Sequence, residues 1–86
     1  MYKLVFLKSA QKEFEKLDFV FQKKIKEKLL LLADEPDALT NNIKALKGEH
    51  KGKFRLRVNK YRIIFQRKED ELIITIIRIG HRKEVY

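Results

Sequence analysis

The stretch FRLRVNKYRIIF, residues 54–65, decides the fold, because apolar and polar side chains alternate on both sides of a polar break at Asn59–Lys60. The alternating apolar residues are Phe54, Leu56, Val58, Tyr61, Ile63 and Phe65. A period of two is typical of a strand that buries one face, and a break of two residues is typical of a tight hairpin turn. The stretch therefore predicts two antiparallel strands with one apolar face and one face that carries arginines.

The sequence after this hairpin predicts a third, central strand. Leu72–Ile79 is rich in β-branched residues at positions of both faces, which is typical of a strand covered on both sides. Lys68–Glu69–Asp70 is the predicted turn that precedes it, and Gly80 ends it. The short final run Glu84–Val85–Tyr86 could add one more strand at the terminus.

The sequence before the hairpin predicts a strand and two helices. Met1–Leu7 alternates apolar and polar side chains and is the predicted first strand. From residue 9 to residue 34 the apolar side chains recur at steps of three and four, as on amphipathic helices. Ser9 and Asp18 are the predicted N-caps, so a short break near Asp18 divides a helical hairpin. The second helix should end before Pro36, because the residue before a proline avoids the helical region.

These elements predict an α+β fold with the order β-α-α-β-β-β, with or without the terminal strand. Residues 35–52 are predicted to be a loop that Ile43 and Leu46 anchor. Amphipathic helices need an apolar surface, so we expect the helical hairpin to pack on one face of a mainly antiparallel, twisted sheet. The chain of 86 residues fits a single domain, residues 1–86.

The charge of the chain is strongly positive, with 21 Lys and Arg residues against 12 Asp and Glu, a formal net charge of +9. Such a charge favours an anionic partner, either nucleic acid or an acidic protein segment, although some small proteins are simply basic. Before residue 36 the lysines are interleaved with carboxylates, as on an ordinary solvated helix surface. Between residues 44 and 62 only Glu49 opposes the basic residues, which are Lys44, Lys47, Lys51, Lys53, Arg55, Arg57, Lys60 and Arg62.

The distribution of arginine narrows the candidate site, because none occurs in the first 54 residues. Arg55 and Arg57 are two positions apart, so on a strand they share a face with ~6.6 Å between them along the chain, near the spacing of neighbouring phosphates. The tight turn should bring Arg62 close to both. Arginine grips phosphate with a rigid fork of donors. We interpret this cluster as a phosphate-binding face, with solvated edge charges as the alternative.

The histidines are the remaining candidates for proton transfer. His81 follows Gly80 and precedes Arg82, and it is the only side chain in that segment of a type that titrates near neutrality. His50 is expected to be an ordinary structural or exposed histidine. The chain has no cysteine, no carboxylate pair near the arginines and no Gly-rich phosphate loop, so we expect neither a metal nor a cofactor.

The segments FRLRVNKYRIIF (54–65), RIGHRKEVY (78–86) and LKG (46–48) closely resemble the RelE family of bacterial and archaeal toxins. The resemblance spans essentially the whole chain and implies a single RelE-like toxin domain with the microbial RNase fold. It implies a metal-independent endoribonuclease that cuts messenger RNA in the ribosomal A site by attack of the substrate 2′-hydroxyl, which inhibits translation. The implied partners are messenger RNA, the ribosome with its 16S rRNA, and a cognate acidic RelB-like antitoxin that wraps the toxin.

The resemblance also implies roles for individual residues. The implied catalytic residues are Arg55, Arg57, Arg62, His81, Arg82 and Tyr86, and the lysines expected to contact RNA or ribosome are Lys44, Lys47, Lys51, Lys53, Lys60 and Lys83. Arg55 and Arg57 match positions that hold the phosphates, and Tyr86 matches a residue that stacks on or orients the substrate. Arginine stays protonated at any working pH, so it is a poor general base. We therefore favour His81 as the proton carrier, with Tyr86 second.

Two features depart from the family pattern, and either could weaken catalysis. Phe65 stands where the family often has tyrosine, and Tyr86 ends the sequence where many members continue. Two alternatives therefore stay open: a ParE-like inhibitor of DNA gyrase, and a non-catalytic module that binds RNA or the ribosome. The sequence has neither a signal-peptide pattern nor a run of apolar residues long enough to span a membrane, so we expect a cytoplasmic protein without a membrane partner.

Overall fold

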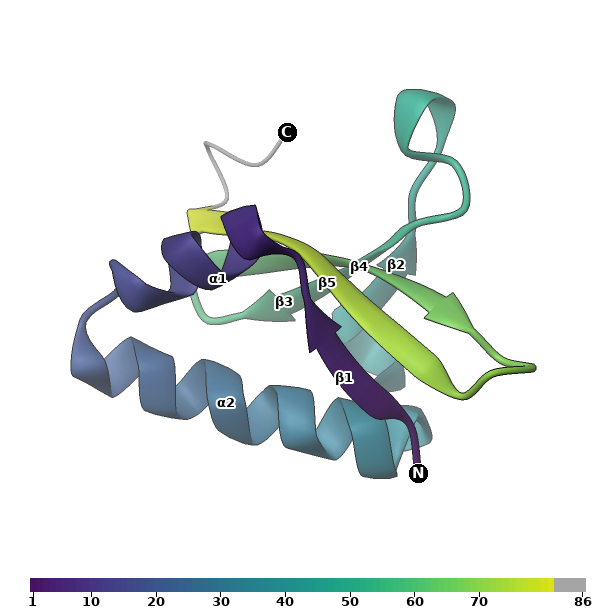
Figure 1. The fold of residues 1–86 in the computed structure, drawn as a ribbon, viewed down its shortest axis with the longest axis horizontal. Coiled ribbons are helices and arrows are strands. Elements are labelled where there is room, and N and C mark those ends of the chain that lie inside the picture. Colours follow the sequence, from purple (N-terminus) through teal and green to yellow (C-terminus); the bar gives the residue numbers. More distant parts are fainter. Residues whose placement is uncertain (82–86) are drawn as a thin grey trace.

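The computed structural model describes residues 1–81, which form two helices packed against one side of a twisted sheet (Figure 1). The elements in chain order are β1 (Lys3–Phe6), α1 (Lys8–Glu15), α2 (Phe19–Asp34), the 3₁₀ segment η1 (Pro36–Asn42), β2 (Ile43–Ala45), the 3₁₀ turn η2 (Gly48–His50), β3 (Phe54–Val58), β4 (Tyr61–Lys68) and β5 (Ile73–His81). The predicted α+β class, the helical hairpin and the order of the main elements are confirmed.

The sheet has five strands in the order β1-β5-β4-β3-β2. β5 lies between β1 and β4, as the prediction of a central strand required. It pairs parallel with β1 and antiparallel with β4, and the remaining pairs are antiparallel. The loop predicted over residues 35–52 is wrong in one respect, because β2 pairs with β3 and forms the far edge of the sheet. β2 spans three residues, which is too short for a period of two to be recognised in the sequence.

The starts of the two helices differ in how well the sequence predicted them. Asp18 is the N-cap of α2 as predicted, but its side chain makes no capping hydrogen bond; its carbonyl accepts from the N–H groups of Phe21 and Gln22, both at 2.9 Å. Ser9 is not the N-cap of α1, which begins at Lys8 with Leu7 as the capping residue. The Leu7 N–H donates to the Ile76 carbonyl at 3.0 Å, so the last contact of β1 with β5 sets where the helix begins.

The side chain of Gln22 joins the two helices. Its Nε2 lies within hydrogen-bonding distance of the carbonyls of Phe14 (3.2 Å), Glu15 (3.2 Å) and Leu17 (2.9 Å). The last carbonyls of a helix have no partner within the helix and need one from elsewhere. Gln22 supplies a donor from the first turn of α2 and so ties the end of α1 to the start of α2.

The core lies between the helices and the sheet. Its fully buried larger residues are Ile25, Leu29, Leu32, Leu56, Ile63, Phe65, Ile74, Ile76 and Ile79. The alternation predicted for the 54–65 hairpin is confirmed, because Leu56, Ile63 and Phe65 belong to this core. No helix within residues 1–81 is long and apolar enough to cross a membrane.

A β-bulge changes the alternation in the middle of β5. Phe65 pairs with Ile76, but the preceding residue of β4 pairs with Arg78, which leaves Ile77 without a partner in β4. An additional residue of this kind shifts the side chains that follow to the other face. As a result Ile76 and Ile79 are both buried in the core although they are three positions apart. The bulge therefore sets which way the last residues of β5 point.

Candidate nucleic-acid interface

The arginines of the 54–65 hairpin lie on the face of the sheet opposite the helices. Arg57 pairs directly with Arg62 across β3 and β4, and Arg55, two positions before Arg57, is diagonal to Arg62. Directly opposite residues on one face have their Cβ atoms about 4.5–5.5 Å apart, and diagonal neighbours about 7–8 Å apart. The tight turn at Asn59–Lys60 thus gathers three guanidinium groups, because the residues between them point into the core.

A hollow of about 430 Å³ opens beside two of these arginines. It is lined by Lys44, Ala45, Leu46, Lys47, His50, Arg55 and Arg62. The unpredicted strand β2 builds its far wall, because Lys44 pairs with Arg55 across β2 and β3. Lys47 and His50 come from the turn that follows β2.

The electrostatics of this face favour an anion. Between residues 1 and 81, the ion pairs are Arg67–Glu69 (3.0 Å), Lys68–Glu71 (3.8 Å) and Arg78–Glu13 (3.2 Å), and none involves Arg55 or Arg57. Arg55 Nε is buried, and no described residue accepts a hydrogen bond from it. A buried donor normally has an acceptor. A phosphate oxygen would supply one and would also relieve the repulsion between the neighbouring arginines.

His81 lies on the other face of the sheet. It pairs with Tyr61, and the two rings are in contact, with centroids 6.2 Å apart. Both rings line a hollow of about 380 Å³ on the helix side, together with Glu13 and Lys16. Gly80 is the residue opposite Arg62, and side chains alternate, so the next residue points away from the arginines. The expectation that His81 joins the arginine cluster does not match this placement.

The sequence predicts an ordinary structural or exposed histidine at His50, yet it is the histidine that the fold brings to the arginines. Its side chain is half-buried and lines the hollow with Arg55 and Arg62. The position of His50 beside the arginines depends on tertiary structure, namely the pairing of β2 with β3. The one indication in the sequence that His50 lies near the arginines is its position two residues after the LKG element.

Glu13 is a second residue that the sequence did not single out. Its Oε1 accepts a hydrogen bond from the Ile79 N–H at 2.9 Å, and its Oε2 pairs with Arg78 at 3.2 Å. β1 pairs with β5 only as far as Phe6 and Ile76, so beyond that point α1 lies along this edge of β5. Glu13 thus holds the end of β5, which carries Gly80 and His81.

Three of the predicted lysines do not line the hollow. Lys60, in the hairpin turn, lies over the rings of Phe21 (5.0 Å) and Tyr61 (5.8 Å), toward the helix side. Lys51 and Lys53 belong to the segment before β3 and do not line the hollow. Arg82, Lys83 and Tyr86 fall outside the described residues. Within residues 1–81, no group of three His, Asp or Glu side chains is placed to hold a metal ion.

Comparisons with known proteins give the context for this site. A family model described as the ParE toxin of the type II toxin–antitoxin system parDE matches residues 4–86. A RelE-like toxin protein of Escherichia coli is 29% identical over 82 residues, which are 95% of this chain and 84% of that protein. The mRNA interferase toxin RelE of Escherichia coli strain K12 is 29% identical over 87 residues, 99% of this chain and 90% of the relative.

A solved structure extends the similarity to the fold. The RelBE2 toxin–antitoxin complex of Mycobacterium tuberculosis contains a chain that superposes with a TM-score of 0.82 at 26% identity. The superposition covers 94% of this chain and 98% of that one. Since the family model matches nearly the whole sequence, this chain belongs to the ParE toxin family, within the RelE/ParE toxins of type II toxin–antitoxin systems.

Proposed function

We propose that this toxin is a ribosome-dependent, metal-independent endoribonuclease that cuts messenger RNA in the ribosomal A site and so inhibits translation in the cytoplasm. The observation that carries the proposal is the row of Arg55, Arg57 and Arg62 on one face of the hairpin, beside a basic hollow. The name mRNA interferase, given to the RelE relative of Escherichia coli, supports it. By resemblance, Arg82 and Tyr86 complete the proposed site.

The proposed reaction is an internal transfer within the RNA. The substrate 2′-oxygen attacks the adjacent phosphorus and loses its proton, the bond from phosphorus to the 5′-oxygen breaks, and the 5′-oxygen gains a proton. The products are a 2′,3′-cyclic phosphate and a 5′-hydroxyl. Negative charge builds up on the non-bridging oxygens in the transition state, and fixed guanidinium groups stabilise it. Arg55 and Arg62 would supply these groups from a rigid strand pair, and an alignment imposed on the RNA would lower the barrier further.

The lysines around the hollow would add affinity without selecting a sequence. Lys44 and Lys47 line it, and both are exposed. Contacts between lysine and phosphate release counterions, so each one makes binding fall more steeply with salt. We expect these residues to position the RNA backbone while the arginines act on the reacting phosphate.

The test is cleavage of a defined message on programmed ribosomes, with the new ends mapped as 5′-hydroxyl and cyclic phosphate. We expect Arg62→Ala to lower the single-turnover rate by ~10²–10³-fold, as the loss of one transition-state donor does. Lys28→Gln removes an exposed charge from α2 and is the matched control, expected to cleave like the parent. No new ends with the parent protein would exclude the proposal, and ribosome binding without cleavage would favour the non-catalytic module.

A second candidate function is inhibition of DNA gyrase, which the ParE description of the matching family favours. Under this alternative the basic face would contact DNA or gyrase and no RNA would be cut. A supercoiling assay with purified gyrase separates the two. Loss of supercoiling together with intact message on ribosomes would replace the endoribonuclease by a gyrase inhibitor.

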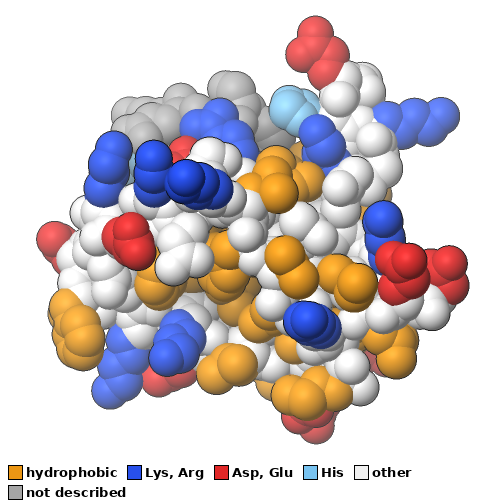
Figure 2. Space-filling model, viewed as in Figure 1, with side chains coloured by type: hydrophobic (Ala, Val, Ile, Leu, Met, Phe, Trp, Pro, Cys, Tyr) orange, Lys and Arg blue, Asp and Glu red, His pale blue; other side chains and the backbone are white. Residues whose placement is uncertain are grey.

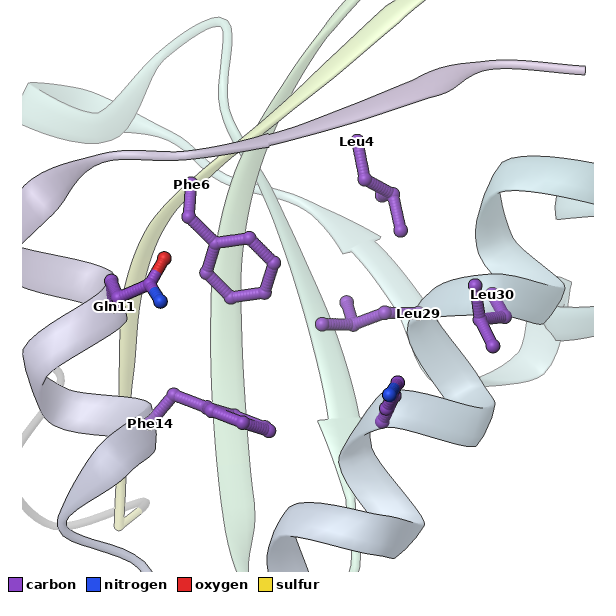
Figure 3. Close-up of a pocket in the computed structure, with 7 residues that line it drawn as sticks. Leu4, Phe6, Gln11, Phe14, Leu29 and Leu30 are labelled. Carbon is purple, nitrogen blue, oxygen red and sulfur yellow. The ribbon is translucent and has the colours of Figure 1, made fainter.

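The proposed antitoxin partner rests on an apolar groove. A groove of about 220 Å³ lies between β1, α1 and α2, and the labelled side chains of Leu4, Phe6, Phe14 and Leu29 point toward one another across it (Figure 3). Lys26 lines both this groove and a second hollow that contains Phe14 and Phe19. Apolar side chains gather across the middle of this face, with basic and acidic side chains around them (Figure 2).

An acidic, amphipathic antitoxin segment fits this groove by its chemistry. Its apolar side chains would cover the exposed Leu30 and Phe19, and its carboxylates would meet Lys26 and the +9 charge of the toxin. The known RelBE2 structure is a toxin–antitoxin complex, which supports a partner of this kind. Coexpression with the acidic product of the neighbouring reading frame should give a stable complex. Purification of the toxin alone after coexpression would count against this partner.

A further inference from the structure

The hollow beside the arginines contains one side chain that can accept a proton. Two of its seven lining residues are apolar, and four are lysines or arginines, namely Lys44, Lys47, Arg55 and Arg62. Lysine and arginine are donors without acceptor capacity in their charged forms, and arginine does not deprotonate in proteins. The seventh is His50, whose neutral imidazole carries one donor and one acceptor nitrogen.

The loop that carries His50 is fixed at both ends by backbone hydrogen bonds. The Leu46 N–H donates to the Lys53 carbonyl at 3.0 Å, and the Lys53 N–H donates to the His50 carbonyl at 3.0 Å. Gly48 and Gly52 have φ values of +68° and +89°, a region that side chains with a Cβ rarely adopt. The loop therefore turns twice within a few residues and returns to β3 just before Arg55.

Charged groups face His50 from each neighbouring element. β2 contributes Lys44, β3 contributes Arg55 and β4 contributes Arg62. Lys47 immediately precedes the 3₁₀ turn η2, which carries His50. Glu49 and Lys51 flank it in sequence and are exposed. A phosphate drawn into the hollow by these cations would lie against the imidazole.

We propose that His50 is the general base of this site, and that it accepts the proton of the substrate 2′-hydroxyl. The inference rests on the proposed RNA cleavage. In this step the 2′-oxygen bonds to phosphorus as its proton passes to an imidazole nitrogen. The phosphorus–oxygen bond to the 5′-oxygen breaks, and that oxygen takes a proton from water.

This proposal assigns the proton transfer to His50 in place of His81. The sequence favours His81 because it follows Gly80 and precedes Arg82, but its ring contacts Tyr61 on the helix side of the sheet. His50 is 31 positions earlier in the numbering and reaches the arginine face because β2 pairs with β3. A base must lie within reach of the proton it removes, and the arginine face is where the reacting phosphate would bind.

The test measures single-turnover cleavage on programmed ribosomes at saturating toxin for the parent, His50→Gln and Glu49→Gln. Glutamine keeps hydrogen-bonding capacity but cannot accept a proton at neutral pH. We expect His50→Gln to slow cleavage by ~10²–10⁴-fold, the usual range for loss of a general base. Its affinity for the ribosome should stay within a few-fold. Glu49→Gln changes the neighbouring exposed residue of the same turn and should leave the rate within two-fold.

A rate–pH profile gives the decisive second readout. The parent rate should rise as a histidine loses its proton, and this rise should be missing from the residual activity of His50→Gln. A His50→Gln rate equal to that of the parent, or an unchanged pH profile, would overturn the assignment while leaving RNA cleavage intact. Absence of cleavage by the parent protein would instead refute the proposed function, and the assignment with it.

Discussion

Replacing Arg57 with glutamine should stabilise the free protein and weaken its binding to RNA. Arg57 is exposed and lies directly opposite Arg62, so its loss opens no cavity and removes one member of a like-charge pair. Two unit charges 5 Å apart repel by ~0.8 kcal/mol in water. Side-chain pairs directly opposite each other in a sheet contribute about 0.2–1 kcal/mol, and like charges there are destabilising, so this repulsion energy has the expected size. Screening and side-chain motion reduce the gain, so we expect about 0.5 kcal/mol.

The melting temperature makes this gain measurable. For a domain of this size 1 kcal/mol corresponds to about 4–8 °C, so Arg57→Gln should melt about 2–4 °C higher than the parent. The measurement is thermal unfolding by circular dichroism in a buffer without phosphate or sulfate. The gain should be present at ~0.01 M salt and largely lost at ~1 M, where the Debye length shrinks from about 30 Å to about 3 Å.

A matched variant separates the local pair from the overall charge. Lys23→Gln also lowers the net charge by one, but Lys23 stands four residues before Glu27 in α2, a favourable spacing for an ion pair. It should therefore gain no stability. For binding to RNA we expect the opposite ranking, with Arg57→Gln weaker than Lys23→Gln, because Arg57→Gln would lose the proposed phosphate contact and the slope of binding against salt should fall by about one. A melting temperature that does not rise at low salt, or that rises equally in Lys23→Gln, would refute the reasoning.

Three further predictions follow from contacts outside the arginine face. Glu13→Ala removes the acceptor of the Ile79 N–H and the partner of Arg78, so it should cost about 1–3 kcal/mol and speed hydrogen exchange at Ile79; unchanged exchange there would contradict it. Gln22→Ala removes the side-chain donor to the carbonyls of Glu15 and Leu17 at the end of α1 and in the turn after it, and urea titration should show a loss of about 1–2 kcal/mol; a loss within error would mean that water replaces the amide. Lys26→Glu should leave the melting temperature nearly unchanged but weaken antitoxin binding in calorimetry, whereas equal affinity would move the antitoxin away from this groove.

The fold was largely predictable because its main strands repeat strict patterns. Phe54 to Phe65 alternate with period two over both arms of a hairpin, and the helices carry apolar stripes that need a sheet to cover. What the sequence could not reveal depends on pairing between distant segments. β2 is three residues long and is recognisable only through its register with Leu56. The start of α1 is set by a hydrogen bond from Leu7 to Ile76, not by the capping preference of Ser9.

The candidate site divides in the same way. Arg55, Arg57 and Arg62 could be placed on one face from spacing alone, because a strand alternates and the turn is tight. The histidines could not, because the face on which His81 lies depends on a bulge at Ile77 and on register with Tyr61. Neighbours in sequence were therefore a poor guide to which histidine accompanies the arginines.

The position of β5 in the sheet has a consequence for synthesis of the toxin. Residues 73–81 form the strand between β1 and β4, so β1 has no strand to pair with until they have been synthesised. A nascent chain that stops short of them exposes the facing edges of β1 and β4, and its helices lack the core residues Ile74, Ile76 and Ile79. Sheets that depend on such distant pairing fold late and slowly. The sheet that carries Arg55, Arg57 and Arg62 is therefore complete only after translation has passed residue 81.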